Sequence, residues 1–291
     1  MLVVLGTAAF VSCSKDDDDN NGGGNNNGEG VITVKIEDEI EFLWIGTSAL
    51  GEVITVNWGD GTTENFVSAI NDDEELYSDF VADLEHEYTE KGTHTITITG
   101  KNIIEFGWEA LTSMSTFTNA IYSIDASKCT TLESLYCYNS GDDNGLIELN
   151  LNGCSALKSL EIEGDLTSLD ISDCTALTYL NCYDNQLTSL DVTQNTALTE
   201  LDCGGNELTS LDVAKNTALT SLNCGYNQLT SLDVTKNTAL TELRCHGNQF
   251  TATEMNKIYE ALPTVESGYL QCNELGNWSI AEEKGWTVNF N

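Results

Sequence analysis

The second half of the chain repeats one pattern of apolar and polar residues. The segment Leu-Thr-Ser-Leu-Asp, followed by Ile or Val, begins at Leu166, Leu187, Leu208 and Leu229, at intervals of 21 residues. Each unit ends on the pattern LxxLxCxxNxL, which is complete from Leu198 to Leu208. One such unit cannot bury its own apolar face, whereas stacked units bury it jointly. The repeat therefore predicts a solenoid with one short parallel strand per unit, regular over residues 146–249.

Two further positions recur inside the predicted units. A first column holds Cys182, Cys203, Cys224 and Cys245. A second column holds Cys129, Cys154, Cys174, Asn195, Asn216 and Asn237. The asparagine of the pattern LxxLxCxxN is expected to turn the chain while its amide satisfies backbone groups in the corner. The other residues of each unit are too few for a full helix, so that side is predicted to be extended or 3₁₀-like.

Residues 31–104 show a different pattern, in which apolar and polar residues alternate. Val31–Ile36 and Val53–Trp58 are rich in β-branched residues, and Thr93–Thr99 alternates as expected of a half-buried strand. The turn sequence Trp58-Gly59-Asp60-Gly61 ends one of these strands. Residues 105–145 contain only a looser form of the repeat, at Leu132, Leu135, Cys137 and Ser140, and are predicted to be the irregular N-terminal part of the solenoid.

Residues 250–291 contain helix signals and are predicted to form a small helical C-terminal cap. Thr251-Ala252-Thr253-Glu254 resembles a capping box. The helix that follows would place four apolar residues on one face: Met255, Ile258, Tyr259 and Leu262. Pro263 would end this helix. A last strand is expected at Tyr269–Asn273 and a short helix from Ser279, with Trp286–Phe290 covering the open core.

One family resemblance rests on paired motifs in the first folded segment. Trp58-Gly59-Asp60-Gly61-Thr62, His86-Glu87-Tyr88 and Gly92–Ile98 together resemble a PKD domain. The resemblance implies an immunoglobulin-like β-sandwich over 31–104 that acts as a spacer or interaction module without an active site. The chain departs from the family in an acidic insertion over 65–85 and in His94, where an aromatic residue is usual. Asp60 and the acidic residues 72–75 lack calcium-loop spacing, so they are interpreted as a turn and a solvated loop, with calcium binding left open.

A second resemblance covers residues 121–291. The repeat matches the leucine-rich-repeat consensus and resembles the repeats of surface lipoproteins and, more distantly, of internalin adhesins. The predicted fold class is therefore mainly β, with a PKD-like β-sandwich followed by a leucine-rich-repeat solenoid that has a parallel β-sheet and the helical C-terminal cap.

The N-terminus suggests export and lipid anchoring. The apolar run MLVVLGTAAFVSC is too short to span a bilayer and is typical of a secretory signal, although no basic residue precedes it. Phe10-Val11-Ser12-Cys13 resembles a bacterial lipobox, which implies a signal over 1–13 and lipid attachment at Cys13. A plain signal peptide is the alternative. Residues 14–30 are rich in Asp, Asn and Gly and are predicted to be a disordered tether.

The acidic run after Cys13 resembles the export signal of some Gram-negative surface lipoproteins. The expected location is therefore the outer membrane, with the protein facing the cell exterior; a solvated spacer on the periplasmic side is the alternative. The formal net charge of −36, from 47 acidic and 11 basic residues, disfavours binding to nucleic acid and to anionic membrane surfaces. Membrane association is expected only through the lipid.

The ten cysteines and three histidines do not suggest chemistry. Stacked cysteines would lie about 4.8 Å apart with parallel Cβ vectors, which is too wide for a relaxed disulfide. They are interpreted as small buried apolar residues, and the lack of CxxC pairs disfavours zinc. His86 and His94 are interpreted as structural. No GxSxG, HExxH or glycine-rich phosphate loop is present, so we expect no catalysis, no metal and no cofactor.

The variable positions of the repeat strands are the candidate binding site, on the predicted concave face. The candidates are Tyr136, Tyr138, Tyr179, Asn181, Tyr183, Glu200, Asp202, Asn223, Tyr226, Glu242, Arg244 and His246. Tyrosines and polar amides suit recognition of a protein or a glycan. The favoured function is an adhesion or protein-binding module. Glycan capture and a structural role in the cell envelope are the alternatives, and the candidates could equally be solvated strand residues.

Overall fold

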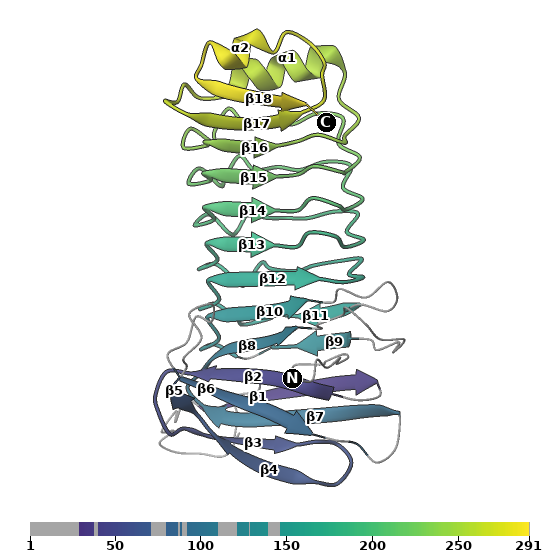
Figure 1. Ribbon diagram of the computed structural model, residues 1–291, viewed down its shortest axis with the longest axis vertical. Coiled ribbons are helices and arrows are strands. Elements are labelled where there is room, and N and C mark those ends of the chain that lie inside the picture. Colours follow the sequence, from purple (N-terminus) through teal and green to yellow (C-terminus); the bar gives the residue numbers. More distant parts are fainter. Residues whose placement is uncertain are drawn as a thin grey trace, which may run out of the picture. The chain divides into compact units, whose positions relative to one another are not determined.

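The computed structural model describes residues 29–37, 40–70, 80–86, 88, 92–109, 121–127, 129–138 and 146–290. Two compact units are present: unit 1 comprises Met1–Leu157 and Glu161–Leu166, and unit 2 comprises Lys158–Leu160 and Thr167–Asn291. The predictions for the signal, Cys13, residues 14–28 of the tether and the acidic residues 72–75 lie outside the described residues. The last two residues assigned to the tether, Glu29 and Gly30, belong instead to the first strand, because they pair with Lys101 and Gly100. The described chain is mainly β, as predicted (Figure 1).

The first sheet of unit 1 has the strand order β11-β9-β1-β7-β3-β4. Its strands are β1 (Glu29–Glu37), β3 (Val53–Asn57), β4 (Thr63–Val67), β7 (Thr93–Lys101), β9 (Ile121–Asp125) and β11 (Glu148–Asn150). All neighbours are antiparallel except β9 and β11. In β7, Ile96 and Ile98 are buried between less buried threonines. The alternation predicted for this strand is therefore confirmed.

A second set of strands in unit 1 has the order β10-β8-β2-β6-β5. These strands are β2 (Ile40–Thr47), β5 (Ala69–Ile70), β6 (Phe80–His86), β8 (Ile103–Glu109) and β10 (Ser134–Tyr138). The prediction that residues 105–145 are irregular is wrong where they are described. There β8 and β10 pair in parallel and bring the buried side chains of Phe106 and Leu135 side by side. This pairing stabilises a strand although the segment lacks the 21-residue spacing.

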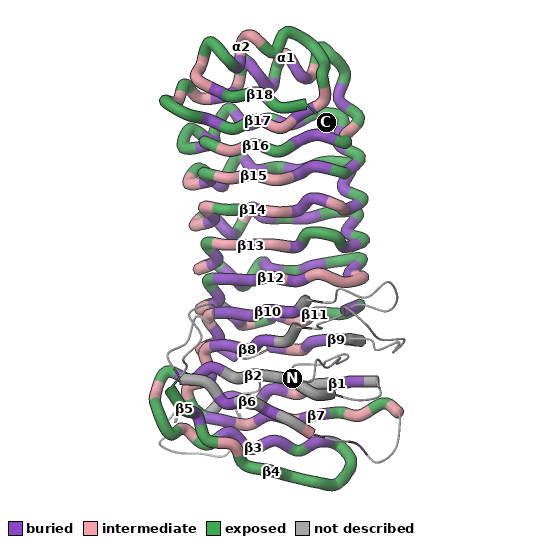
Figure 2. Tube along the Cα trace, viewed as in Figure 1, coloured by how far each residue is buried: buried purple, intermediate pink, exposed green. Residues whose placement is uncertain are grey.

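Unit 2 is a solenoid of parallel strands that follow one another in chain order (Figure 1). The strands are β13 (Tyr179–Asn181), β14 (Glu200–Asp202), β15 (Ser221–Asn223), β16 (Glu242–Arg244), β17 (Gly268–Cys272) and β18 (Trp286–Phe290). Strand β12 (Ser159–Glu163) has residues in both units. From β13 to β16 the central leucines align and are buried, as the repeat predicts. Figure 2 shows these buried stretches recurring on successive strands.

The predicted asparagine ladder is present at the corner after each strand. The Asn206 amide nitrogen donates to the carbonyl oxygens of Cys182, Cys203 and Gly204 at 2.9, 3.2 and 3.1 Å. Its oxygen accepts a hydrogen bond from the Leu187 backbone nitrogen at 3.0 Å. Asn227 makes the same set of contacts one repeat later. Each asparagine therefore ties two consecutive repeats together.

The opposite side of each repeat consists of tight turns, in agreement with the extended or 3₁₀-like prediction. Backbone hydrogen bonds join residues three apart, such as Asn195 to Val192 and Leu198 to Asn195, both at 3.1 Å. The amide nitrogen of Asn195 donates to the carbonyl oxygens of Ile171 and Cys174 at 2.9 and 2.8 Å. Asn216 and Asn237 repeat this second ladder. Both faces of the solenoid core are thus held by side-chain amides.

Eight of the nine described cysteines are buried thiols rather than disulfides. Cys129 is not among these free thiols. Burial raises the pKa of the Cys224 thiol to about 12 and those of Cys203 and Cys245 well above the ordinary value. The repeat cysteines therefore serve as small apolar core residues, as predicted.

Helix α1 (Ala252–Ala261) follows the last regular repeat. The Thr251 side chain accepts a hydrogen bond from the Glu254 backbone nitrogen, and Met255, Ile258 and Tyr259 are buried. The predicted start and apolar face of this helix are therefore confirmed. Helix α2 (Ser279–Glu282) is a single short turn. No helix in the described part of the chain is long and apolar enough to cross a bilayer.

Candidate binding surface

The strand face of unit 2 is the row of outward side chains on β13–β17. Its first column, in strand register, is Tyr179, Glu200, Ser221, Glu242 and Tyr269. Its second column is Asn181, Asp202, Asn223, Arg244 and Gln271. These side chains alternate with the buried leucines, so the structure brings together the candidates predicted on these strands. Sequence reasoning missed Tyr269 and Gln271, although Tyr269-Leu270-Gln271-Cys272 repeats the local strand pattern.

Local structure explains much of the second column. The side-chain oxygens of Asn181, Asp202 and Asn223 accept hydrogen bonds from backbone nitrogens two residues further on, at 3.0, 2.9 and 3.0 Å. These turns end each strand, and Asn and Asp are the residues that form them best. The second oxygen of Asp202 accepts a hydrogen bond from the Asn223 amide at 2.9 Å. The choice of Asn or Asp here is therefore structural, while the charge of Asp202 stays on the surface.

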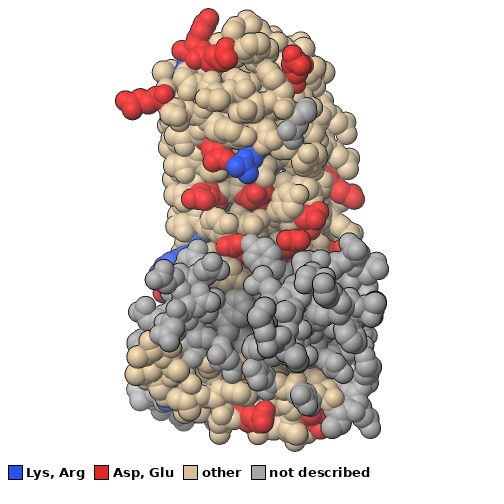
Figure 3. Space-filling view, in the orientation of Figure 1, with Lys and Arg blue, Asp and Glu red and all other residues tan. Residues whose placement is uncertain are grey.

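Arg244 is the basic residue of the strand face. Its guanidinium lies 2.8 Å from the Glu242 carboxylate and 5.7 Å from the centre of the Tyr269 ring. A cation between a carboxylate and an aromatic face is a favourable arrangement at a partly exposed site. Figure 3 shows acidic side chains gathered over the strands of unit 2, with few basic ones among them.

The tyrosines at the strand ends are exposed, whereas the histidine beside them is not. Tyr183 and Tyr226 are 39% and 55% exposed. His246 is only 6% exposed, so its assignment to the binding face is wrong. Its ring lies over Gly225, where an added Cβ would come within 2.9 Å of it, and the Tyr226 ring contacts it edge-on at 4.6 Å. Burial, and then Arg244, lower the pKa of His246.

One candidate on β10, Tyr136, is buried. Tyr136 is 7% exposed and therefore presents little of its ring to a partner. It pairs with Gly107 of β8, a strand that the sequence analysis did not predict. The prediction for the side chain of Tyr138 lies outside the described side chains. The strand face of unit 2 is therefore considered without Tyr136.

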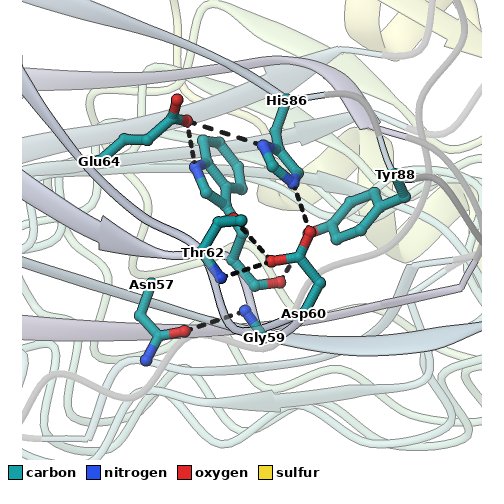
Figure 4. Close-up of polar contacts among 8 residues, drawn as sticks. Asn57, Gly59, Asp60, Thr62, Glu64, His86 and Tyr88 are labelled. Carbon is teal, nitrogen blue, oxygen red and sulfur yellow. Dashed lines mark hydrogen bonds and ion pairs between the residues drawn. The ribbon is translucent and has the colours of Figure 1, made fainter.

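The titratable cluster of unit 1 is a structural network (Figure 4). Asp60 accepts hydrogen bonds from the Thr62 hydroxyl and backbone nitrogen at 2.6 and 2.9 Å on one oxygen. Its other oxygen lies 2.8 Å from His86 Nε2. The Thr62 hydroxyl, above all, holds the pKa of Asp60 well below its usual range. Both oxygens are engaged, so this carboxylate supports the turn.

Aromatic stacking completes the network. The His86 ring stacks on Trp58 at 4.6 Å, and Tyr88 stacks on His94 at 3.8 Å. The Tyr88 hydroxyl donates to the Trp58 carbonyl oxygen at 2.9 Å. Both histidines therefore have the structural positions that the sequence predicts. Within the described residues, no group of three or more His, Cys, Asp or Glu side chains is placed to hold a metal ion.

Comparison with known proteins identifies the repeat. Residues 175–216 match the family model described as leucine-rich repeats in two copies, which confirms this prediction for the matched part of unit 2. No curated protein matches the chain.

Several solved structures are similar to the chain. The functional domain of InlJ from Listeria monocytogenes, described as including a cysteine ladder, is 25% identical, with a TM-score of 0.34, over 59% of this chain and 48% of that one. An internalin (InlF) of the same organism is 18% identical, with a TM-score of 0.47, over 59% and 54%. A leucine-rich-repeat protein of Leptospira interrogans is 24% identical, with a TM-score of 0.41, over 57% and 42%. The chain spans about half the length of these proteins.

Proposed function

We propose that this chain is a non-catalytic cell-surface protein whose strand face binds another protein, as an adhesion or protein-binding module. One observation carries the proposal. The outward first column changes from Tyr179 to Glu200 to Ser221, while the buried position beside it is leucine in every repeat strand. Folding explains the constant column. The varied column is not needed for folding, and its mixture of aromatic, acidic and small residues supports a role in recognition.

The composition and rigidity of the face suit a protein partner. Tyrosine and arginine are the residues most often found at the centre of protein interfaces, and the face contributes Tyr179, Tyr269 and Arg244. The asparagine ladders fix the strands beneath these side chains. A preorganised surface loses little conformational entropy on binding.

The chemistry of the face supports a non-catalytic role. The thiols of unit 2 are buried, and their pKa values are raised where the direction is known, so they are poor nucleophiles. The serine of the strand face, Ser221, lies in register between Glu200 and Glu242 and has no histidine beside it in the columns.

Glycan capture is the second candidate function. The exposed rings of Tyr183 and Tyr226 favour it, because they lie near the amides of Asn181 and Asn223 in sequence and project at the strand ends. Aromatic rings beside amides suit sugar recognition as well as protein recognition. A structural role in the envelope is the remaining alternative.

The proposal includes the location and organisation that the sequence motifs suggest. Lipid attached at Cys13 anchors the chain in the outer membrane, facing the exterior, through the tether 14–30. Residues 31–104 act as a PKD-like β-sandwich spacer, for which the network around Asp60 and Trp58 is supporting evidence. Residues 250–291 cap the solenoid, where the Trp286 indole donates to the Pro263 carbonyl oxygen at 2.8 Å.

Parallel binding arrays test the function. The purified chain is applied to an array of extracellular proteins and to a glycan array, together with Ser221→Tyr, which places a bulky ring in the middle of the strand face. Ser210→Tyr is the matched control, because Ser210 is exposed in the loop between strands. We expect protein hits that S221Y abolishes and S210Y retains. Hits on glycans alone would favour the second candidate function. If S221Y abolishes no hit on either array, the structural role in the envelope is the function that remains.

A further inference from the structure

We infer that the strand face of unit 2 binds a basic protein segment, with an arginine side chain seated against Glu200 and Asp202. This inference deepens the proposed function and rests on it. It specifies the chemistry of the partner and the position on the face that binds the partner's positive charge.

The strand face is nearly symmetric about Ser221. Reading outward along the first column, Glu200 and then Tyr179 lie on one side, and Glu242 and then Tyr269 lie on the other. The second column has an amide at both ends, Asn181 and Gln271. Of the four pairs of positions that this symmetry relates, three therefore hold the same type of residue.

The exception to this symmetry reverses a charge. Arg244 occupies the second column of β16, and Asp202 occupies the matching place on β14. Arg244 is paired with Glu242 and lies over Tyr269, so the half formed by β16 and β17 contains its own cation. The half formed by β13 and β14 has the glutamate and the tyrosine with a second carboxylate in place of the cation. The chain itself thus shows which group fits between these side chains.

The two carboxylates of the β14 half are available to a partner's cation. Glu200 is exposed and forms no ion pair within the described part of the chain. Asp202 is held by the Gly204 nitrogen and the Asn223 amide, which are neutral donors that orient the carboxylate without cancelling its charge. Residues two apart on a strand lie on the same face, about 7 Å from each other. A guanidinium can bridge two such carboxylates with its fork of donors, whereas an ammonium is a single point charge.

Charge complementarity extends beyond this pair. The face carries Glu200, Asp202 and Glu242 against Arg244, and the whole chain has a net charge of −36. Such a field accelerates the encounter with a basic partner and disfavours an acidic one. This field attracts any basic partner, so specificity has to come from the contacts of Glu200 and Asp202 with the arginine. The test must therefore separate these local contacts from the general attraction.

The test measures binding of a defined peptide to the full chain by fluorescence anisotropy. The probe carries three arginines separated by Gly-Ser, and a peptide with citrulline in place of arginine reports contacts that need no charge. The variant is Glu200→Gln with Asp202→Asn, in which asparagine keeps the turn that Asn223 makes at the equivalent position. The matched control is Glu207→Gln with Asp212→Asn, which removes the same charge from exposed residues off the strand face.

The expected result is a loss of affinity of about tenfold in E200Q/D202N, while the control changes by about twofold or less. The citrulline peptide should bind no better to the native chain than to the variant. Equal losses in variant and control would overturn the inference, since they would show only the attraction of a highly acidic chain. A lysine peptide that binds as well as the arginine peptide would also contradict the guanidinium seat.

A second variant completes the symmetry. Asp202→Arg places a guanidinium beside Glu200, as Arg244 lies beside Glu242, and should abolish peptide binding. Circular dichroism at the binding temperature checks that the variant is folded, because it loses the hydrogen bonds that Asp202 accepts from the Gly204 nitrogen and the Asn223 amide. Unchanged binding in D202R would overturn the inference even if the first variant behaved as expected. The test of the proposed function is independent of this one. If S221Y abolishes the array hits and E200Q/D202N leaves them intact, the strand face still binds a protein, and only the inference of a basic partner is overturned.

Discussion

The side-chain nitrogen of Asn206 lies 2.9 Å from the carbonyl oxygen of Cys182, a residue 24 positions earlier in the chain. The contact joins the corner of one repeat to the strand end of the repeat before it. Its sister contacts from Asn227 to Cys203 and from Asn248 to Cys224 have nearly the same length. The same contact therefore joins successive repeats, and the effect of removing it at one corner can be measured.

Replacing Asn206 with Ala should lower the free energy of unfolding by about 1–3 kcal/mol, because buried backbone groups lose their partners. The Leu187 nitrogen and the Cys182 carbonyl oxygen are among them. Gln228→Ala, at an exposed position of the next corner, is the control. Chemical denaturation followed by circular dichroism gives both values. Equal midpoints for the two variants would mean that the ladder is dispensable.

Acid should weaken unit 1 through Asp60. Its pKa is lowered in the folded chain, so the carboxylate stabilises the fold above the unfolded pKa of about 3.9. That contribution is lost as the pH falls from about 4 towards the lower folded pKa. Asp60→Asn should be less stable than the native chain at neutral pH and should lose less stability on acidification. Thermal melts between pH 7 and pH 3 measure this, and parallel pH profiles would contradict it.

The repeat thiols should be hidden until the protein unfolds. A buried thiol with a raised pKa, such as that of Cys224, has little thiolate at pH 8 and poor access to reagent. Native protein should therefore react slowly with a thiol reagent, and denatured, unreduced protein should expose the eight described thiols. A denatured count near zero would show that the columns are disulfide-bonded and that the parallel ladder is wrong.

Lipid anchoring is tested at Cys13. Cys13→Ala should release the protein from the membrane fraction, while Ser12→Ala, which keeps a small residue before the cysteine, should leave it there. Mass spectrometry of the membrane-bound protein would identify the lipid. If C13A stays in the membrane fraction, the anchor lies elsewhere. Protease treatment of intact cells tests orientation separately, and complete protection would place the protein on the periplasmic side.

The sequence predicted most of unit 2 because one residue in each repeat reports several features at once. Asn206 marks a corner, a strand end and a ladder contact, and all three are present. Tyr269 was missed as a candidate binding residue, although its strand was predicted, because helix α1 lengthens the step from Glu242 to 27 residues, which breaks the 21-residue count. The strand β17 nevertheless pairs with β16, since pairing depends on the backbone and not on the interval.

Burial was the property that the repeat pattern could not decide. His246 occupies the column of Tyr183, but it packs over Gly225, whose missing side chain gives the ring its place. Whether His246 is buried depends on a glycine in the neighbouring repeat, so its position within its own repeat does not predict its burial. In unit 1 the same limit applies to Tyr136, which lies in a strand whose partner, β8, carries no repeat signal.

The regular step of the ladders also bears on how such a gene changes. Asn195, Asn216 and Asn237 each bind the backbone 24 and 21 residues earlier. A recombination that duplicates or deletes one whole repeat of coding sequence leaves all of these contacts in step at the new junction. The core need not be rebuilt, while the spacing between the β14 carboxylates and the Arg244 pair changes by one strand. Descendants of this gene that differ in copy number would therefore fold alike and present differently spaced charges to their partners.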